Sequence, residues 1–275
     1  GLSFGTDSTF EVITWNLEYF PKSSETVNRV AEIIFLLNPD VLGFQEITSR
    51  SALMLVVDRL NSFTGSETWI GYRAGSTGST GQQLAYIINT ENVSVLQSPF
   101  EIYEDEGRAF PRKPYVLRVV VNGQEVVIIN NHLKCCGNGE IEEDSWDEET
   151  RRQEASLKLQ TYIEESWAET QVIIIGDYND EIDEPASDNV FWNFISQPNQ
   201  FKFTDMNIAN GHSSDYSYPT WPSHIDHILI TNELFDEFES ANSEVRTIRV
   251  DDFLEGGWEE YETNISDHRP VGWKY

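Results

Sequence analysis

Residues 173–180 read Ile-Ile-Ile-Gly-Asp-Tyr-Asn-Asp. Together with Val172, the isoleucines form a short apolar run of β-branched residues, which predicts a strand buried on both faces. Gly176 allows another backbone to approach where the strand ends. Asp177 and Asn179 follow, two residues apart. A buried strand that ends in polar side chains is how α/β enzymes present functional groups.

Two interpretations of this strand end stay open on the segment alone. Asp177 beside Asn179 can hold and deprotonate a water molecule near a phosphorus atom. The same residues can form an Asx turn that closes the strand. The rest of the chain has to decide between them.

The same unit recurs in both directions from this segment. Further strands are predicted over residues 10–15, 41–44, 84–88, 115–121, 126–130, 224–230 and 270–273. Helical spacing of apolar residues predicts helices over 24–37, 51–61 and 150–167. Asn122-Gly123 predicts a hairpin turn, and residues 75–81 and 139–149 predict loops too short to link domains. We therefore expect one α/β domain over residues 1–275.

The charge balance is strongly acidic. Among 275 residues, 18 are basic and 47 acidic, which gives a formal net charge of −29. Such a surface repels polyanions and argues against a protein that scans DNA. It leaves nucleic acid open as a substrate, because bound cations and a few arginines dominate within about 8–10 Å. Acidic surfaces are common on exported proteins, so we expect a secreted or periplasmic location. The absence of an initiator Met adds to this expectation. No apolar run reaches the ~18 residues of a membrane span.

The two cysteines are neighbours, Cys135 and Cys136. This count excludes a fold held by several disulfides. Adjacent cysteines bridge only through a strained ring, so two free thiols are the default. A vicinal disulfide stays open for an exported protein.

Polar residues that share one chemical theme stand at the ends of at least five predicted strands. They are Asn16, Glu46, His132, Asp177, Asn179, Asp226, Asp267 and His268. Their oxygen atoms suit Mg²⁺, Mn²⁺ or Ca²⁺. A histidine oriented by a carboxylate, for which Asp226 is suited, can stabilise a developing charge or protonate a leaving oxygen. Each residue alone has an ordinary structural explanation, but the set favours a catalytic site.

These segments resemble the motifs of the endonuclease/exonuclease/phosphatase superfamily, the deoxyribonuclease I-like metal-dependent phosphoesterases. The matching segments, in the family's order, are ITWNL, DVLGFQEI, FPRKP, NNHLK, GDYN, PTWPSHIDHIL and SDHRPV. They run from Asn16 to Pro270, and seven in order are specific although each is loose. The resemblance implies a four-layer α/β sandwich, in which two packed mixed β-sheets are flanked by helices.

The resemblance also implies a role for each matched residue. The metal ligands would be Asn16, Glu46 and Asp267, with Mg²⁺ or Mn²⁺ as the cofactor and Ca²⁺ as a further option. Asp177 would orient or deprotonate the attacking water, Asn179 would position the phosphate, and His268 would pair with Asp226. The scissile phosphate would contact His132 and Arg112. Lys134 either binds substrate at the mouth of the site or is a turn residue.

Two departures from the family pattern stand out. His224 replaces an Arg that many relatives carry before Ile-Asp, which removes a positive charge. Gln82 or Gln83 occupies the region of the Glu that orients the first His in deoxyribonucleases. His132 is therefore expected to lack a carboxylate partner, which argues against a highly efficient deoxyribonuclease. We assign His212 and His227 structural roles.

The sequence thus predicts a divalent-metal-dependent phosphoester hydrolase. A phosphodiesterase or endonuclease that acts on DNA or RNA is favoured. The alternative is a phosphatase or phosphodiesterase for small phosphorylated molecules, such as sugar, inositol or lipid headgroups, because a shared fold does not choose the substrate. A non-catalytic binding module is disfavoured by the intact set of site residues. Nothing in the sequence indicates an obligate protein partner.

Overall fold

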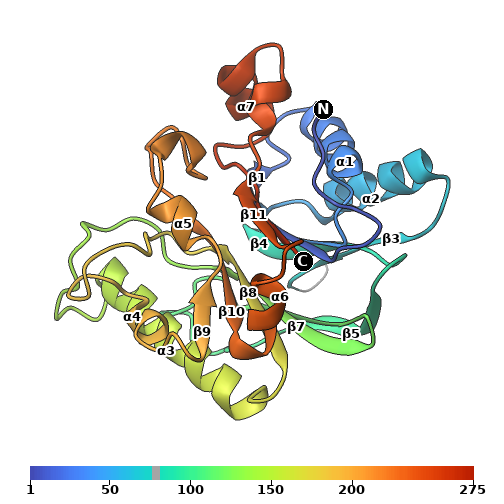
Figure 1. Cartoon of the computed structure of the whole chain (residues 1–275). Helices are drawn as coiled ribbons and strands as arrows, with labels where there is room; N and C mark the ends of the chain where they lie inside the picture. Colours follow the sequence, from blue (N-terminus) through green and yellow to red (C-terminus); the bar gives the residue numbers. More distant parts are fainter. Residues whose placement is uncertain (76–80) are drawn as a thin grey trace.

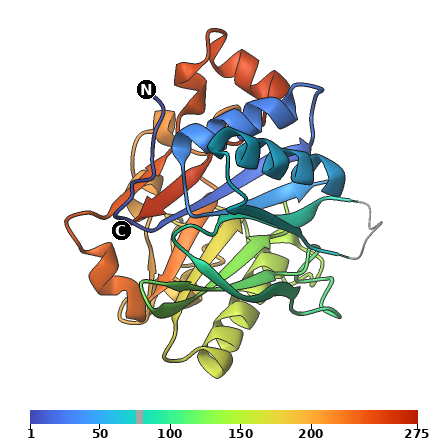
Figure 2. The ribbon, with the colours of Figure 1, turned by 90° about the vertical axis from the view of Figure 1, so that its right-hand side faces the viewer.

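The computed structural model describes residues 1–75 and 81–275 of the chain. Within these ranges the strands form two six-stranded sheets. The sheets pack face to face, with helices against both outer faces (Figures 1 and 2). The predicted four-layer α/β sandwich is confirmed.

The first sheet has the strand order β11-β12-β1-β2-β4-β3. Its strands are β1 (Glu11–Phe20), β2 (Val41–Ile47), β3 (Trp69–Arg73), β4 (Gln83–Asn89), β11 (Glu244–Thr247) and β12 (Val271–Lys274). β1 and β2 are parallel, and the other neighbours are antiparallel. The sheet is therefore mixed.

The second sheet has the order β5-β6-β7-β8-β10-β9. Its strands are β5 (Ser94–Glu101), β6 (Tyr115–Val121), β7 (Gln124–His132), β8 (Gln171–Asp177), β9 (Phe201–Phe203) and β10 (Asp226–Thr231). Here β7 and β8 are the parallel pair. The predicted hairpin joins β6 to β7, and its turn residues Asn122 and Gly123 have the positive φ of a hairpin turn, 50° and 83°.

Helices cover the outer faces of both sheets. α1 (Thr26–Leu37) and α2 (Arg50–Thr64) pack on the first sheet, and α3 (Glu148–Ser166) packs on the second (Figure 2). The remaining helices are α4 (Trp192–Ile195), α5 (Met206–Ala209), α6 (Phe235–Phe238) and α7 (Gly257–Asn264), with 3₁₀ turns η1 (Ser213–Asp215), η2 (Asn232–Leu234) and η3 (Val250–Phe253). In the described ranges, no helix combines the length and the apolar character that a membrane crossing requires.

Apolar side chains from both sheets fill the space between them. Polar contacts also cross this core. The Tyr86 hydroxyl donates to the carbonyl oxygens of Tyr115 and Ile128, at 2.8 and 2.9 Å. The Asn130 amide donates to the carbonyl oxygens of Phe44 and Ala85, at 3.0 and 3.1 Å. These hydrogen bonds satisfy buried polar groups and hold the sheets in register.

The predicted elements are present, with shifted boundaries. The first strand continues to Phe20 through an irregular register after Asn16. The strand predicted from residue 224 begins at Asp226. Of the two predicted loops, residues 76–80 lie outside the described residues, and the acidic one gives way to α3 at Glu148. The strands that prediction missed are short or at an edge, for example the largely exposed β5.

Candidate active site

Strand ends from both sheets meet at one point. His132 ends β7 and is in register with Asp177, which ends the parallel strand β8. Asp226 begins the antiparallel strand β10 opposite Asp177. From the other sheet, the Asn16 amide donates a 2.8 Å hydrogen bond to Asp177 Oδ2. The topology therefore gathers residues that are far apart in sequence.

Gly176 makes this convergence possible. A Cβ atom built on Gly176 would lie 2.2 Å from the carbonyl oxygen of Asn131 on the neighbouring strand. Any other residue would push β7 away from β8 and separate His132 from Asp177.

A pocket of about 810 Å³ opens over the convergence point. Seven of the predicted site residues line it: Asn16, Glu46, Arg112, His132, Asp177, Asn179 and His268. The pocket is large enough for a nucleotide-sized ligand.

The Asp177 carboxylate is the centre of the polar network. Its Oδ1 accepts from the Asn179 backbone N–H at 3.0 Å, and its Oδ2 lies 3.4 Å from His132 Nε2 and 3.9 Å from His268 Nε2. Burial raises the pKa of Asp177, the His268 charge opposes this, and the Asp226 charge adds to it, for a value of about 7. A carboxyl group with this pKa can gain and lose a proton near neutral pH.

His268 and Asp226 form a buried pair. His268 Nδ1 lies 2.7 Å from Asp226 Oδ2. Burial alone lowers the pKa of His268, but the charges of Asp226 and Asp177 raise it to about 10. The ring is therefore an imidazolium at neutral pH, with Nε2 directed towards Asp177.

His132 differs from His268 in its protonation. Burial and the nearby Arg112 charge lower the pKa of His132 well below its usual value. Among the described residues, none forms a hydrogen bond with His132 Nδ1. The ring is therefore neutral, and a carboxylate partner is lacking at Nδ1, as the Gln82 region led us to expect.

Gln82, one of the two glutamines noted in the sequence, links Glu46 to Arg112. Its amide nitrogen donates to Glu46 Oε2 at 2.6 Å, and its amide oxygen accepts from Arg112 at 2.8 Å. Arg112 also donates to the Leu133 carbonyl oxygen at 3.3 Å. Gln82 thus links an acidic residue to the guanidinium group that faces the pocket.

The three predicted metal ligands lie in one hydrogen-bonded chain with Glu18. Asn16 Nδ2 is 3.4 Å from Glu46 Oε1, and Asn16 Oδ1 accepts from the Glu18 backbone N–H at 2.9 Å. Glu18 Oε2 accepts from the Asp267 backbone N–H at 3.0 Å. Burial raises the pKa of Glu18, contact with the Lys22 ammonium opposes the rise, and the charge of Asp267 adds to it. The Glu18 and Asp267 carboxylates are thus close enough to repel one another.

Asp226, Asp267 and Lys134 lie outside the pocket lining. Asp226 is behind His268, and Asp267 Oδ1 is 3.9 Å from His268 Nε2. The Lys134 ammonium donates to the Cys135 carbonyl oxygen at 2.8 Å and lies 3.4 Å from Glu148. The structure therefore brings the two aspartates to the site but turns the Lys134 side chain away from it.

Several residues at or beside the site were not predicted from the sequence, among them Glu18 and Tyr218. Glu18 and Tyr19 follow Asn16 with positive φ values of 41° and 54°. This local distortion accompanies the contact of the Glu18 carboxylate with the Asp267 backbone N–H, and no sequence signal marks it. Tyr218 lies against the imidazolium of His268, with ring centroids 4.8 Å apart. Its place in the segment before PTWP was the available signal.

A group of three acidic residues lines the pocket beyond Asn179, apart from Glu46 and Asp267. It consists of Asp180, Glu181 and Glu184. Burial raises the pKa of each, and their mutual repulsion helps to raise that of Glu184 to about 8. The Arg152 guanidinium offsets part of this charge through a 2.7 Å contact with Asp180. The pocket is rich in oxygen donors and poor in free cations.

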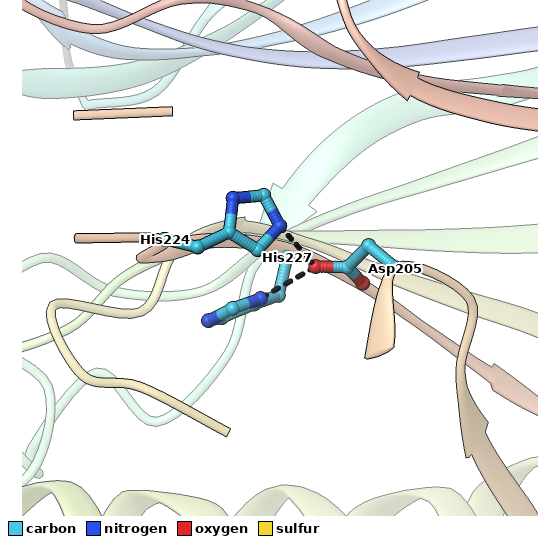
Figure 3. A group of neighbouring side chains, drawn as sticks. All are labelled: Asp205, His224 and His227. Atoms are coloured by element: carbon cyan, nitrogen blue, oxygen red, sulfur yellow. Dashed lines mark hydrogen bonds and ion pairs between the residues drawn. The ribbon is translucent and has the colours of Figure 1, made fainter. Parts of the chain in front are cut away.

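Asp205, His224 and His227 form a separate buried cluster (Figure 3). Asp205 Oδ2 lies 2.8 Å from His224 Nε2 and 2.6 Å from His227 Nδ1. His227 Nε2 contacts the Asp180 carbonyl oxygen, and His224 Nδ1 accepts from the Ser217 backbone N–H. Every ring nitrogen is thus engaged.

The hydrogen bonds of this cluster determine its protonation. Both nitrogens of His227 face oxygen acceptors, so the ring is an imidazolium paired with the Asp205 carboxylate. Accordingly, the charge of Asp205 raises the pKa of His227 despite burial, which alone lowers it. The cluster is a buried ion pair with no free ligand position, and it supports the structural role assigned to His227.

The fold is similar to solved structures at low sequence identity. D. rerio TDP2, solved with a single-strand DNA product, has a TM-score of 0.69 at 16% identity, covering 98% of this chain and 99% of that one. The human Nocturnin catalytic domain, with bound sulfate, has a TM-score of 0.63 at 15% identity, with coverages of 97% and 93%. An endonuclease/exonuclease/phosphatase from Bacteroides vulgatus has a TM-score of 0.62 at 16% identity, with coverages of 98% and 98%.

The family comparison covers nearly the whole chain. No curated protein matches the sequence. The model of the Endonuclease/Exonuclease/phosphatase family matches residues 13–268, which include nearly every strand of both sheets and all the site residues described above. The chain belongs to the endonuclease/exonuclease/phosphatase family.

Proposed function

We propose that this protein is a divalent-metal-dependent phosphodiesterase that acts as an endonuclease on nucleic acid. Members of its family are hydrolases that act on phosphoesters. The observation that carries the proposal is the contact of Asp177 with Asn16 from the other sheet and with two histidines of different protonation. This arrangement supplies a base, a neutral imidazole and a cationic imidazole within one pocket.

In the proposed reaction, Asp177 orients the attacking water and accepts its proton. A pKa of about 7 suits a base that works near neutral pH. The Asn179 backbone N–H and the Asn16 amide each donate to the carboxylate and orient it. In-line attack on phosphorus then requires the leaving oxygen on the opposite side.

The phosphate oxygens would be held by residues around Asp177. The His268 imidazolium, kept charged by Asp226, stabilises the negative charge that develops on phosphorus. The neutral His132 donates from Nε2, and the Arg112 guanidinium contributes a fixed positive charge. Gln82 orients Arg112 through its amide oxygen.

The acidic residues fit a divalent cation. Asp267 Oδ1 is buried and has no hydrogen-bond partner among the described residues, and Glu18 lies next to Asp267. With Glu46 they form a set of oxygen donors that suits Mg²⁺ or Mn²⁺, with Ca²⁺ as a further option. When bound, such an ion lowers the pKa of water and neutralises phosphate charge. Asn16 orients Glu46 and would contribute its amide oxygen only if it released Glu18.

Exposed aromatic residues at the pocket favour nucleic acid. Tyr19 and Trp221 line the pocket, and their side chains are 62% and 76% exposed. Exposed rings beside a phosphate site can stack on bases whatever the sequence. The single-strand DNA product in the D. rerio TDP2 structure supports the same substrate class.

A phosphatase or phosphodiesterase for small phosphorylated molecules is the second candidate. The net charge of −29 favours it, because a small substrate meets less repulsion than a polyanion. The acidic surface is also the support for our proposal that the protein is secreted or periplasmic. We further propose that residues 1–275 act as one catalytic unit.

A panel of four substrates tests the proposal. Plasmid DNA, RNA, bis(p-nitrophenyl) phosphate and p-nitrophenyl phosphate would each be incubated with and without chelator. Cleavage of the diesters and of nucleic acid only in the absence of chelator is expected. A preference for the monoester with intact plasmid would favour the second candidate instead.

A further inference from the structure

Two neighbouring thiols lie at the edge of the active-site pocket. Cys135 is half-buried and Cys136 is exposed, and both line the pocket. Their Sγ atoms are 2.9 Å apart. The proposed phosphoester reaction uses neither of them.

The surrounding structure imposes the conformation that brings the thiols together. Cys136 has a φ of 74°, in a region that residues other than Gly rarely adopt. One guanidinium nitrogen of Arg152 donates to the carbonyl oxygens of Lys134 and Cys136, each at 2.7 Å. Arg152 is itself buried. The buried Arg152 side chain therefore holds this strained turn in place.

We propose that Cys135 and Cys136 form a reversible redox site, which closes as a vicinal disulfide and lowers the activity of the adjacent pocket. The co-reactant is a low-molecular-weight disulfide. The exposed Cys136 thiolate attacks one sulfur of this disulfide, and the first small thiolate leaves and takes up a proton from water. Cys135 then loses its proton to water and attacks Cys136 Sγ as the thiolate, which expels the second small thiolate, and this thiolate also takes up a proton. Two protein thiols are oxidised while one small disulfide becomes two thiols.

The ring that forms is easy to reopen. Adjacent Cα atoms are about 3.8 Å apart, closer than the roughly 4.4–6.8 Å of ordinary disulfides, so the bond is strained. Strained, exposed disulfides are the ones that small thiols reduce readily. The hydrogen bond with Cys135 raises the pKa of the Cys136 thiol, so exchange should accelerate with rising pH.

The turn that carries the thiols is bonded to the catalytic loops. The carbonyl oxygen of Leu133 accepts from both Asn179 and Arg112, at 3.3 Å each. Arg152, which holds the Cys136 carbonyl, contacts the Asp180 carboxylate at 2.7 Å. Ring closure rearranges this backbone and thereby displaces Asn179 and Arg112. The expected loss of turnover rests on the proposed function, but the thiol chemistry does not.

The test treats the full chain with glutathione disulfide and follows two readouts. Intact mass should fall by two hydrogen atoms, and the two titratable thiols should disappear. Turnover of bis(p-nitrophenyl) phosphate should fall, at most by the roughly 100-fold that ångström-scale misplacement causes. Dithiothreitol should restore both the thiols and the turnover.

Serine variants serve as matched controls. The double variant Cys135→Ser/Cys136→Ser should keep its activity and ignore the oxidant. Cys135→Ser alone should retain one glutathione on Cys136, because no neighbouring thiol can release it.

Three results would overturn the inference. Two thiols that persist after treatment would exclude the redox site. Closure without any change in turnover would remove its coupling to the pocket. An equal loss of activity in the double variant would place the effect elsewhere. If the reduced protein cleaves no phosphoester at all, the proposed function fails, and the mass measurement still decides the thiol site.

Discussion

Asp226 and His268 are 42 residues apart in the chain, yet Asp226 Oδ2 lies 2.7 Å from His268 Nδ1. Asp226 begins β10 in the second sheet, whereas His268 precedes β12 in the first. The pair therefore spans the two sheets at the pocket. Burial lowers the pKa of His268, and the Asp226 charge is the largest of the carboxylate contributions that raise it to about 10, so the protonation of the ring depends on this packing.

Asp226→Asn should lower the pKa of His268 and with it the activity. The amide carries no charge, so burial would be opposed only by the Asp177 and Asp267 charges, and the ring would lose its proton nearer neutral pH. We expect kcat to fall by at least ~10²-fold, with a loss that grows as pH rises. NMR titration of His268 in the metal-free protein would measure the pKa directly. The control is Asp40→Asn. Asp40 is also a buried carboxylate, but it precedes β2, whereas Glu46 lies near the other end of that strand.

The same pair predicts a pH dependence of stability. The folded pKa of His268 is raised above the unfolded value of 6.5 to about 10. Its contribution to the free energy of unfolding is thus fully present below pH 6.5 and is lost as pH rises through about 10. Urea unfolding of metal-free protein across this window should show a steeper decline in wild type than in Asp226→Asn. Parallel curves would refute the assignment.

Asp177→Asn and His268→Ala should each lower kcat by at least ~10²-fold, the usual contribution of a general base or of a group that stabilises charge in the transition state. Both residues lie at the pocket edge of their sheets, so the fold should survive, as circular dichroism would verify. A variant with near-wild-type kcat would show that we have assigned its role wrongly.

Activity should require a divalent cation. Glu18, Glu46 and Asp267 bring negative charge together, and a cation screens it. EDTA should abolish hydrolysis of any phosphoester, and Mg²⁺ or Mn²⁺ should restore it. Glu46→Gln and Glu18→Gln should each raise the metal concentration needed for half-maximal activity, because an anionic ligand becomes neutral. An unchanged titration would remove that residue from the metal site.

Much of this site could be predicted because buried strands are recognisable in the sequence as apolar runs. The apolar run before Asp177 and the run before Glu46 are continuous, so their ends could be located from sequence. Glu18 could not be found in this way. β1 changes register after Asn16, and Glu18 has a positive φ. A glutamate in the sequence does not indicate such a backbone conformation.

Proximity in the sequence wrongly suggested that Lys134 reaches the pocket, and it gave no indication of the cluster around Asp205. Lys134 follows the His132 motif, but the chain turns at Cys135 and Cys136, and the ammonium faces Glu148 instead of the pocket. Asp205 was not predicted as part of a cluster, because it follows the short strand β9, which the sequence pattern did not indicate. Only the fold shows that it meets His224 and His227, about twenty residues further on.

Asp205→Asn should destabilise the protein strongly. It leaves the buried imidazolium of His227 without a counter-charge, which typically costs about 3–5 kcal/mol. The pKa of Asp205 is lowered from 3.8 and that of His227 is raised from 6.5. The pair therefore stabilises most between these two values and less on either side. Urea unfolding within this pH range measures the effect, with His212→Asn as an exposed control.

Substrate choice depends on charge more than on the shared catalytic residues. A chain of net charge −29 approaches DNA against its own field, so few phosphates can be neutralised. Log KM for DNA should therefore vary only shallowly with log salt concentration, as expected for a few phosphate contacts. A steep slope would contradict this picture.

Arg112 should carry a large share of the phosphate binding that remains. Its guanidinium faces the pocket and is oriented by Gln82, whereas Arg152, which also lines the pocket, is engaged by Asp180. Arg112→Ala should weaken turnover of DNA and of bis(p-nitrophenyl) phosphate alike, because both present a phosphodiester oxygen. Arg249→Ala, on the surface, is the charge-matched control and should change neither. If p-nitrophenyl phosphate is hydrolysed far faster than the diester and plasmid stays intact, the same residues serve a phosphomonoesterase.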